Sequence, residues 1–124
     1  MKRLCVVLLL TSCVLSGCTP GQYSQLQSIP PATKPTIPTA KESCDAAGGH
    51  WSQQGLGGGP MVCDLPATDA FKICTDNAQC QGACRVEKTI PPGAKALGSC
   101  SEFVTNYGCQ SYLKEGRVVR VCTD

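Results

Sequence analysis

Residues 73–86 read ICTDNAQCQGACRV and bring three cysteines close together in the chain. Thr75 or Asp76 has a side chain that can cap a single helical turn running to Gln79, and Gly82 is suited to end that turn. No amphipathic helix of useful length is visible here or elsewhere in residues 44–124. The stretch therefore predicts a compact, cross-linked turn.

Cysteine is frequent throughout the chain. There are 11 cysteines among 124 residues, together with 13 Gly and 9 Pro, while aromatic residues make up only 5%. This composition is typical of disulfide scaffolds in oxidising compartments. Eight cysteines follow residue 43, which predicts four disulfides, although eight thiols allow 105 pairings and the sequence does not choose among them. They are Cys44, Cys63, Cys74, Cys80, Cys84, Cys100, Cys109 and Cys122.

Two segments predict β-hairpins. Residues 50–53 and 61–65 flank a glycine-rich loop, and residues 107–122 read YGCQSYLKEGRVVRVC, with Glu115-Gly116 at the turn and valines that favour strands. Residues 88–98 contain Pro-Pro-Gly and predict a surface loop. The expected fold of residues 44–124 is a small disulfide-rich domain, mainly β, with short hairpins and little helix.

Residues 19–43 differ sharply from this domain. They contain five prolines among Ser, Thr and Gln, and no cysteine. Because proline lacks an amide donor and disfavours helix at the residue before it, the stretch predicts an extended, solvated and disordered tether. At about 3.1 Å per residue it could reach roughly 75 Å. It is either a spacer that holds the domain away from a membrane or a leader without a selected length.

The first eighteen residues predict export. Lys2 and Arg3 precede an apolar run, residues 4–15, that is too short to span a bilayer. The run ends in Leu15-Ser16-Gly17-Cys18, which resembles the lipobox of bacterial lipoproteins. That resemblance implies a signal peptide over residues 1–17 and a tether over 18–43 that starts at an acylated Cys18. Acyl chains such as palmitate would then anchor the protein in a lipid bilayer.

The residue after the lipobox indicates to which membrane the protein is sorted. Many lipoproteins of Gram-negative bacteria stay at the inner membrane when Asp follows the acylated cysteine, whereas this chain has Thr19. The resemblance thus implies the outer membrane, with the domain facing the periplasm or the cell surface. The alternative is plain secretion, with cleavage near Gly17 and a spare thiol at Cys18.

Two further resemblances concern the domain. Cys74-Thr75-Asp76-Asn77-Ala78-Gln79-Cys80 is similar to the Cys-x-x-Asp-x-x-Cys run of whey-acidic-type four-disulfide inhibitor modules, although those modules have adjacent cysteines where this chain has Cys84-Arg85. The wider pattern, Cys44 with Gly48-Gly49 and Trp51, then Asp69-Ala70 leading to Lys72 and Cys74, resembles small cysteine-rich Gram-negative proteins of unknown function.

Charge and residue types argue against several functions. Without residues 1–17, nine Lys and Arg face nine Asp and Glu, so no basic surface for nucleic acid is expected. His50 is the single histidine, and Asp64, Asp69 and Asp76 lie near turns, where aspartate is an ordinary turn former. We expect no enzyme and no cofactor.

The sequence contains only weak signs of a metal site or of redox chemistry. Cys74, Cys80 and Cys84 suggest a zinc knot, but a second cysteine pair with matching spacing is missing, and no Cys-x-x-Cys motif occurs. We therefore expect no metal site. The candidate binding residues are Leu56, in the glycine-rich loop, and Trp51, beside that loop. Trp51 is equally suited to filling a thin core.

The expected function is a membrane-anchored lipoprotein. It presents a disulfide-stapled, non-enzymatic module in the cell envelope that binds a protein or acts like an inhibitor. A partner would be an envelope protein or the cell wall. The alternatives are a structural envelope component without a discrete partner, and a metal or redox module.

Overall fold

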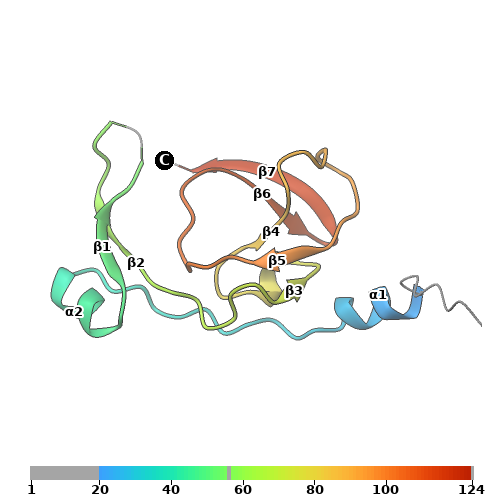
Figure 1. The fold of residues 1–124 in the computed structure, drawn as a ribbon, viewed down its shortest axis with the longest axis horizontal. Helices are drawn as coiled ribbons and strands as arrows, with labels where there is room; N and C mark the ends of the chain where they lie inside the picture. The colour runs from blue at the N-terminus through green and yellow to red at the C-terminus, as the bar shows by residue number, and fades with distance from the viewer. Residues whose placement is uncertain (1–19, 56, 124) are drawn as a thin grey trace, which may run out of the picture.

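The computed structural model describes residues 20–55 and 57–123. Two short helices come first and are followed almost entirely by strands (Figure 1). Neither described helix has the length and apolar character needed to cross a membrane. The elements are α1 (Pro20–Gln27), α2 (Lys41–Ala46), β1 (His50–Gln53), β2 (Met61–Asp64), β3 (Ile73–Cys74), the 3-10 turn η1 (Asn77–Gln79), β4 (Cys84–Arg85), β5 (Gly98–Cys100), β6 (Gly108–Lys114) and β7 (Arg117–Thr123).

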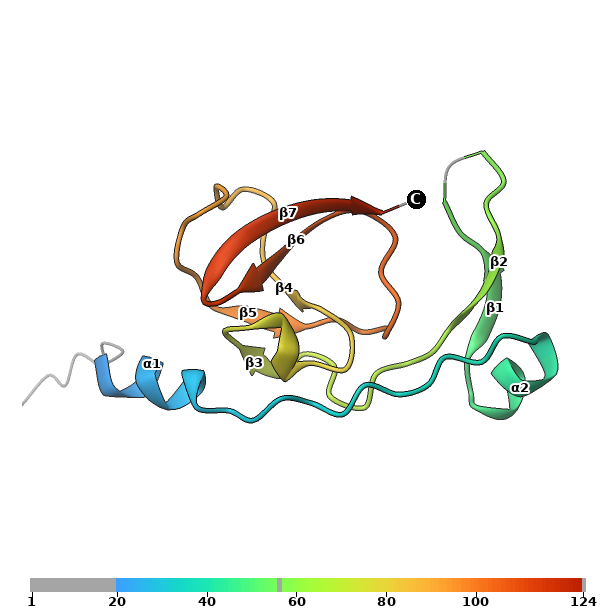
Figure 2. The ribbon, with the colours of Figure 1, turned by 180° about the vertical axis from the view of Figure 1, so that it is seen from behind.

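The elements form two lobes, which stand side by side in Figures 1 and 2. In the hairpin lobe, residues 41–64, α2 packs against the antiparallel pair β1–β2. In the sheet lobe, residues 73–123, five antiparallel strands lie in the order β3-β5-β4-β6-β7. The predicted class, a small disulfide-rich fold that is mainly β, is confirmed.

Four disulfides use all eight cysteines that follow residue 43, as predicted. Three of the bridges cross-link the sheet lobe, and one ties α2 to β2 in the hairpin lobe. The pairing, which the sequence left open, is Cys44–Cys63, Cys74–Cys84, Cys80–Cys100 and Cys109–Cys122.

The hairpin at the end of the chain forms where the valine-rich pattern predicted it. Lys114 pairs with Arg117, which leaves a two-residue turn in which Glu115 and Gly116 both have positive φ, 51° and 73°. Turns of this kind match the twist of the flanking strands. Leu113 and Val118 face each other across the hairpin and are 0% and 1% exposed, so this pair joins the cysteines in the core.

The predicted capped turn is also present. Asp76 accepts a hydrogen bond from the Ala78 amide at 2.7 Å, and the Gln79 side chain returns to the Asp76 amide at 3.3 Å, which completes a capping box. The helical turn runs to Gln79, as predicted, but its C-cap is Cys80 and not Gly82. A Cβ atom at Gly82 would lie 2.2 Å from Ser101 Oγ, so close packing explains that glycine.

The N-terminal segment differs from the predicted disordered tether. Residues 20–27 form α1, and only residues 28–40 are extended, as proline favours. The extended part is also not simply solvated, because Ala32 donates its amide to Ala78 O at 2.8 Å and Lys34 contacts carbonyls of the sheet lobe. Contacts between distant parts of the chain therefore fix a path that the local proline content leaves free.

Candidate binding site

A hollow lies between the two lobes. A cavity of about 340 Å³ is lined by Trp51 and Met61 from the hairpin lobe, by Thr105 and Tyr107 from the sheet lobe, and by Ile37-Pro38 from the N-terminal segment. Rings and apolar chains from three separate parts of the chain thus meet at one place. Concave, mainly apolar sites of this kind are the usual form of binding sites.

A second cavity, of about 420 Å³, continues from Tyr107. Its lining includes Gln54 and Gly55 on one side and the Cys109–Cys122 disulfide with Thr123 on the other. We call the two cavities together the interlobe groove. Among the described residues that line it, none is Asp, Glu, Lys, Arg or His. The groove therefore suits a ligand that is uncharged and partly apolar.

Asp64 connects the walls of the groove. Its carboxylate accepts hydrogen bonds from Ser52 at 3.1 Å and Gln54 at 2.7 Å in the hairpin lobe, and from Thr105 at 3.0 Å in the sheet lobe. The backbone adds a second link, since Val104 donates its amide to Leu65 O at 2.9 Å. These bonds hold the two lobes at one separation.

Of the two predicted binding residues, the structure describes only Trp51. Trp51 is half-buried, pairs with Cys63 in the β1–β2 register and lines the groove. Leu56 lies outside the described residues. The loop that carries it needs its glycines, because Gly55 and Gly57 have φ of 87° and 77°.

Sequence reasoning missed the other groove residues. Tyr107, Met61 and the pair Ile37-Pro38 carry no local signal for binding. They come from segments far apart in the chain and meet only in the folded domain. The one signal in the sequence was that aromatic residues are few. Because aromatic side chains are enriched at binding sites, each of these few rings was a candidate anchor.

The three aspartates weighed for catalysis have structural roles. His50 is exposed on β1. Asp69 accepts the Gln81 amide at 2.8 Å, and Asp76 accepts the amides of Ala78 and Glu115 at 2.7 and 2.5 Å. Together with the links made by Asp64, these contacts are those of turn and lobe-linking residues, and the absence of enzyme activity stays a prediction.

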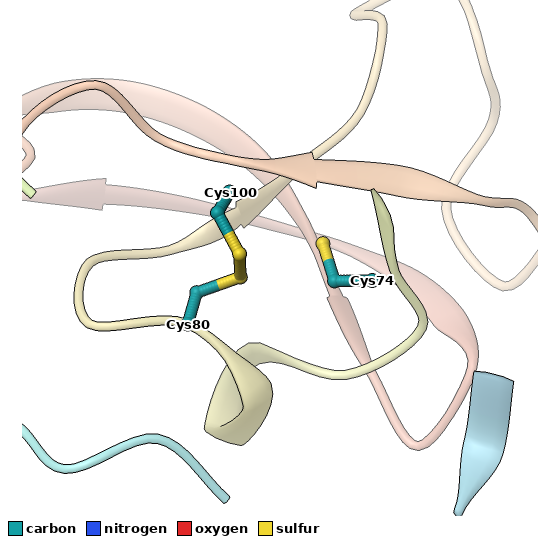
Figure 3. A group of neighbouring side chains, drawn as sticks. All are labelled: Cys74, Cys80 and Cys100. Atoms are coloured by element: carbon teal, nitrogen blue, oxygen red, sulfur yellow. A yellow bond between two sulfur atoms is a disulfide. The ribbon is translucent and has the colours of Figure 1, made fainter. Parts of the chain in front are cut away.

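Three buried sulfur atoms cluster within the sheet lobe (Figure 3). Those of Cys74, Cys80 and Cys100 all lie within 4.8 Å of one another, a spacing that would suit a metal ion. Metals bind thiolates, however, and each of these sulfurs is in a disulfide, Cys80 with Cys100 and Cys74 with Cys84. The cluster is thus two disulfides packed against each other at the centre of the fold.

An exposed apolar patch lies away from the groove. Phe71, Ile73 and Leu97 are 71%, 58% and 44% exposed, and Phe71 and Leu97 line a cavity of about 370 Å³. Arg85 and Glu87 also line that cavity, so the patch is charged as well as apolar. It lacks the enclosing second lobe of the interlobe groove.

Comparison with known proteins adds no function. The chain matches no protein-family model, no curated protein and no solved structure. A fold class by itself does not determine function, so the function must be argued from the groove and the sequence motifs.

Proposed function

We propose that this protein is a lipid-anchored component of the bacterial cell envelope that binds another envelope protein without catalysis. The observation that carries the proposal is the interlobe groove, in which Trp51, Met61 and Tyr107 meet in a lining that contains no charged side chain among the described residues. The partner segment is uncharged and partly apolar. The anchor is Cys18, on the basis of the lipobox-like Leu15-Ser16-Gly17-Cys18.

The construction of the groove supports this function. One wall carries the Cys44–Cys63 bridge and the other the Cys109–Cys122 bridge, and Asp64 links the lobes. A rigid site loses little conformational entropy when it binds, which raises affinity. Aromatic side chains in such sites often supply most of the binding energy.

Trp51→Ala and Tyr107→Ala are expected to weaken partner binding. Each loss should be on the order of 30-fold, the effect of removing an anchor worth about 2 kcal/mol. Because the groove lacks charge, the affinity should change little between low and high salt. The partner would be captured from the envelope by crosslinking, and its dissociation constant measured by calorimetry after purification.

Ile73→Ala is the matched control, because it removes an exposed apolar side chain that lies outside the groove. A partner that binds the Trp51 and Tyr107 variants as well as the unmodified protein would contradict the proposal that the groove is the binding site. Co-sedimentation with the cell wall, unchanged in both variants, would support the structural envelope role instead.

The anchor has a separate test. The intact mass of the protein from a Gram-negative membrane fraction should match cleavage before Cys18 plus acyl groups. We expect no free thiol as isolated and eight after reduction, one for each domain cysteine. Fractionation of the membranes would test the outer-membrane location that Thr19 implies. An unacylated mass would overturn the anchor while leaving the groove open to test.

A further inference from the structure

The extended segment from residue 28 to residue 40, here called the strap, contacts the sheet lobe through the side chain of Lys34. The Lys34 ammonium donates hydrogen bonds to Gly82 O at 2.8 Å and Asn77 O at 3.3 Å, and a third to Cys80 O. An ammonium has three donors, and here each meets a main-chain carbonyl. Burial lowers the pKa of Lys34, and Asp69 and Asp76 partly oppose that shift.

Further bonds lie on the N-terminal side of Lys34. Ala32 N–H donates to Ala78 O at 2.8 Å, and Leu26 O, at the end of α1, accepts from the Gln79 side chain at 3.0 Å. All of these partners lie between residues 75 and 82, the stretch held by the two central disulfides. The strap is therefore docked on the most heavily cross-linked part of the domain.

The docked strap runs from one end of the molecule to the other. In Figures 1 and 2 it runs along one side of the sheet lobe, from α1 at one end to α2 and the β1–β2 hairpin at the opposite end. Trp51 and Met61, which belong to that hairpin, line the groove. The groove thus lies toward the hairpin end of the long axis, and the sheet lobe separates it from the start of α1.

We propose that the strap, locked by Lys34, orients the anchored domain so that the interlobe groove faces away from the bilayer. This inference rests on the lipid anchor and the groove proposed above. Only Thr19 separates Cys18 from α1, and one residue spans at most about 3.6 Å, so the α1 end is held near the membrane. The partner is then a protein of the adjoining compartment and not one embedded beside the anchor.

The test adds the full protein, isolated from a Gram-negative membrane fraction, to phospholipid vesicles and uses two readouts. Amide hydrogen exchange at Ala32 reports docking of the strap. Energy transfer from Trp51, the single tryptophan of the chain, to acceptors on lipid headgroups reports how near the groove lies to the bilayer. Lys34→Met removes the ammonium and keeps an unbranched side chain. Lys41→Met is the matched control, because Lys41 pairs only with exposed Asp45 among the described contacts.

In the unmodified protein, Ala32 should be protected and transfer from Trp51 weak. Lys34→Met should lower the protection on the order of tenfold or more, since three bonds to a charged donor are lost, and should increase transfer as the released domain turns. Lys41→Met should leave both unchanged. A freely exchanging Ala32, or one that is indifferent to Lys34→Met, overturns the lock.

The orientation of the domain and the lipid anchor would be overturned by different results. Strong transfer from Trp51 with a protected Ala32 would overturn the orientation and leave the docked strap intact. Protein that does not associate with vesicles, with Ala32 still protected, would refute the lipid anchor and with it the orientation, while the strap lock would stand.

Discussion

At the scale of single residues, Phe71 is held in a backbone conformation that does not suit it. Its φ is 67°, in the left-handed region that bulky residues rarely adopt, while its amide donates to Cys100 O at 2.9 Å. The side chain is 71% exposed and therefore contributes little packing. The surrounding bonds impose this conformation, and the ring does not stabilise it.

Phe71→Gly should accordingly be more stable than Phe71→Ala by about 1 kcal/mol. Both substitutions remove the ring, but only glycine adopts positive φ without a steric penalty. Unfolding in denaturant, with equal slopes for the two variants, would measure the difference. Equal stability would show that the left-handed conformation carries no cost at this position.

At the scale of elements, the disulfides contribute unequally. Cys109 and Cys122 are exposed and face each other across β6–β7, a hairpin that its own turn and register already close. Cys80 and Cys100 are buried and join the capped turn to β5 across 20 residues. The second bridge therefore adds a covalent restraint between distant segments that are otherwise joined by hydrogen bonds, such as the one from the Ser101 amide to Ala83 O at 2.8 Å.

Replacing Cys80 and Cys100 together by alanine should destabilise the domain more than replacing Cys109 and Cys122 together. Both lose a bridge worth about 2–4 kcal/mol, but only the buried pair also leaves a cavity. Thermal unfolding of the two double variants gives the comparison. A lower midpoint for the Cys109 and Cys122 variant would show that the hairpin bridge is the more important one.

At the scale of the whole molecule, six of the eight domain cysteines make up most of the core. Apart from them, the buried hydrophobic residues in the described part of the chain are Ala83, Leu113 and Val118. So small an apolar core cannot offset the conformational entropy of a domain of this size. The cross-links, which restrict the unfolded chain, supply the missing stability in the chain-entropy description.

Reduction of all four disulfides should therefore unfold the domain at room temperature. It should also release the strap, because the carbonyls that bind Lys34 lie between reduced cysteines. Near-ultraviolet circular dichroism reports the first effect and exchange at Ala32 the second. The control is treatment with a thiol-alkylating reagent without reductant. A native-like spectrum after complete reduction would contradict this account.

The sequence by itself determined features that depend on near neighbours. The turn chemistry of Glu115-Gly116, a cap at Thr75 or Asp76 and the flanks of the glycine-rich loop each act within a few residues, and the two hairpins and the capped turn formed where they were predicted. The count of eight cysteines also predicted four bridges, because complete pairing in an oxidising compartment requires only an even number.

Only the tertiary structure decided how these pieces meet. The disulfide pairing, the approach of Tyr107 to Trp51 and the docking of Lys34 join residues that are far apart in the chain. Lys34 binds main-chain carbonyls, which every residue possesses, so no residue type marks its site in the sequence. Local pattern specifies local elements, whereas the groove and the strap depend on long-range contacts that exist only once the chain has folded.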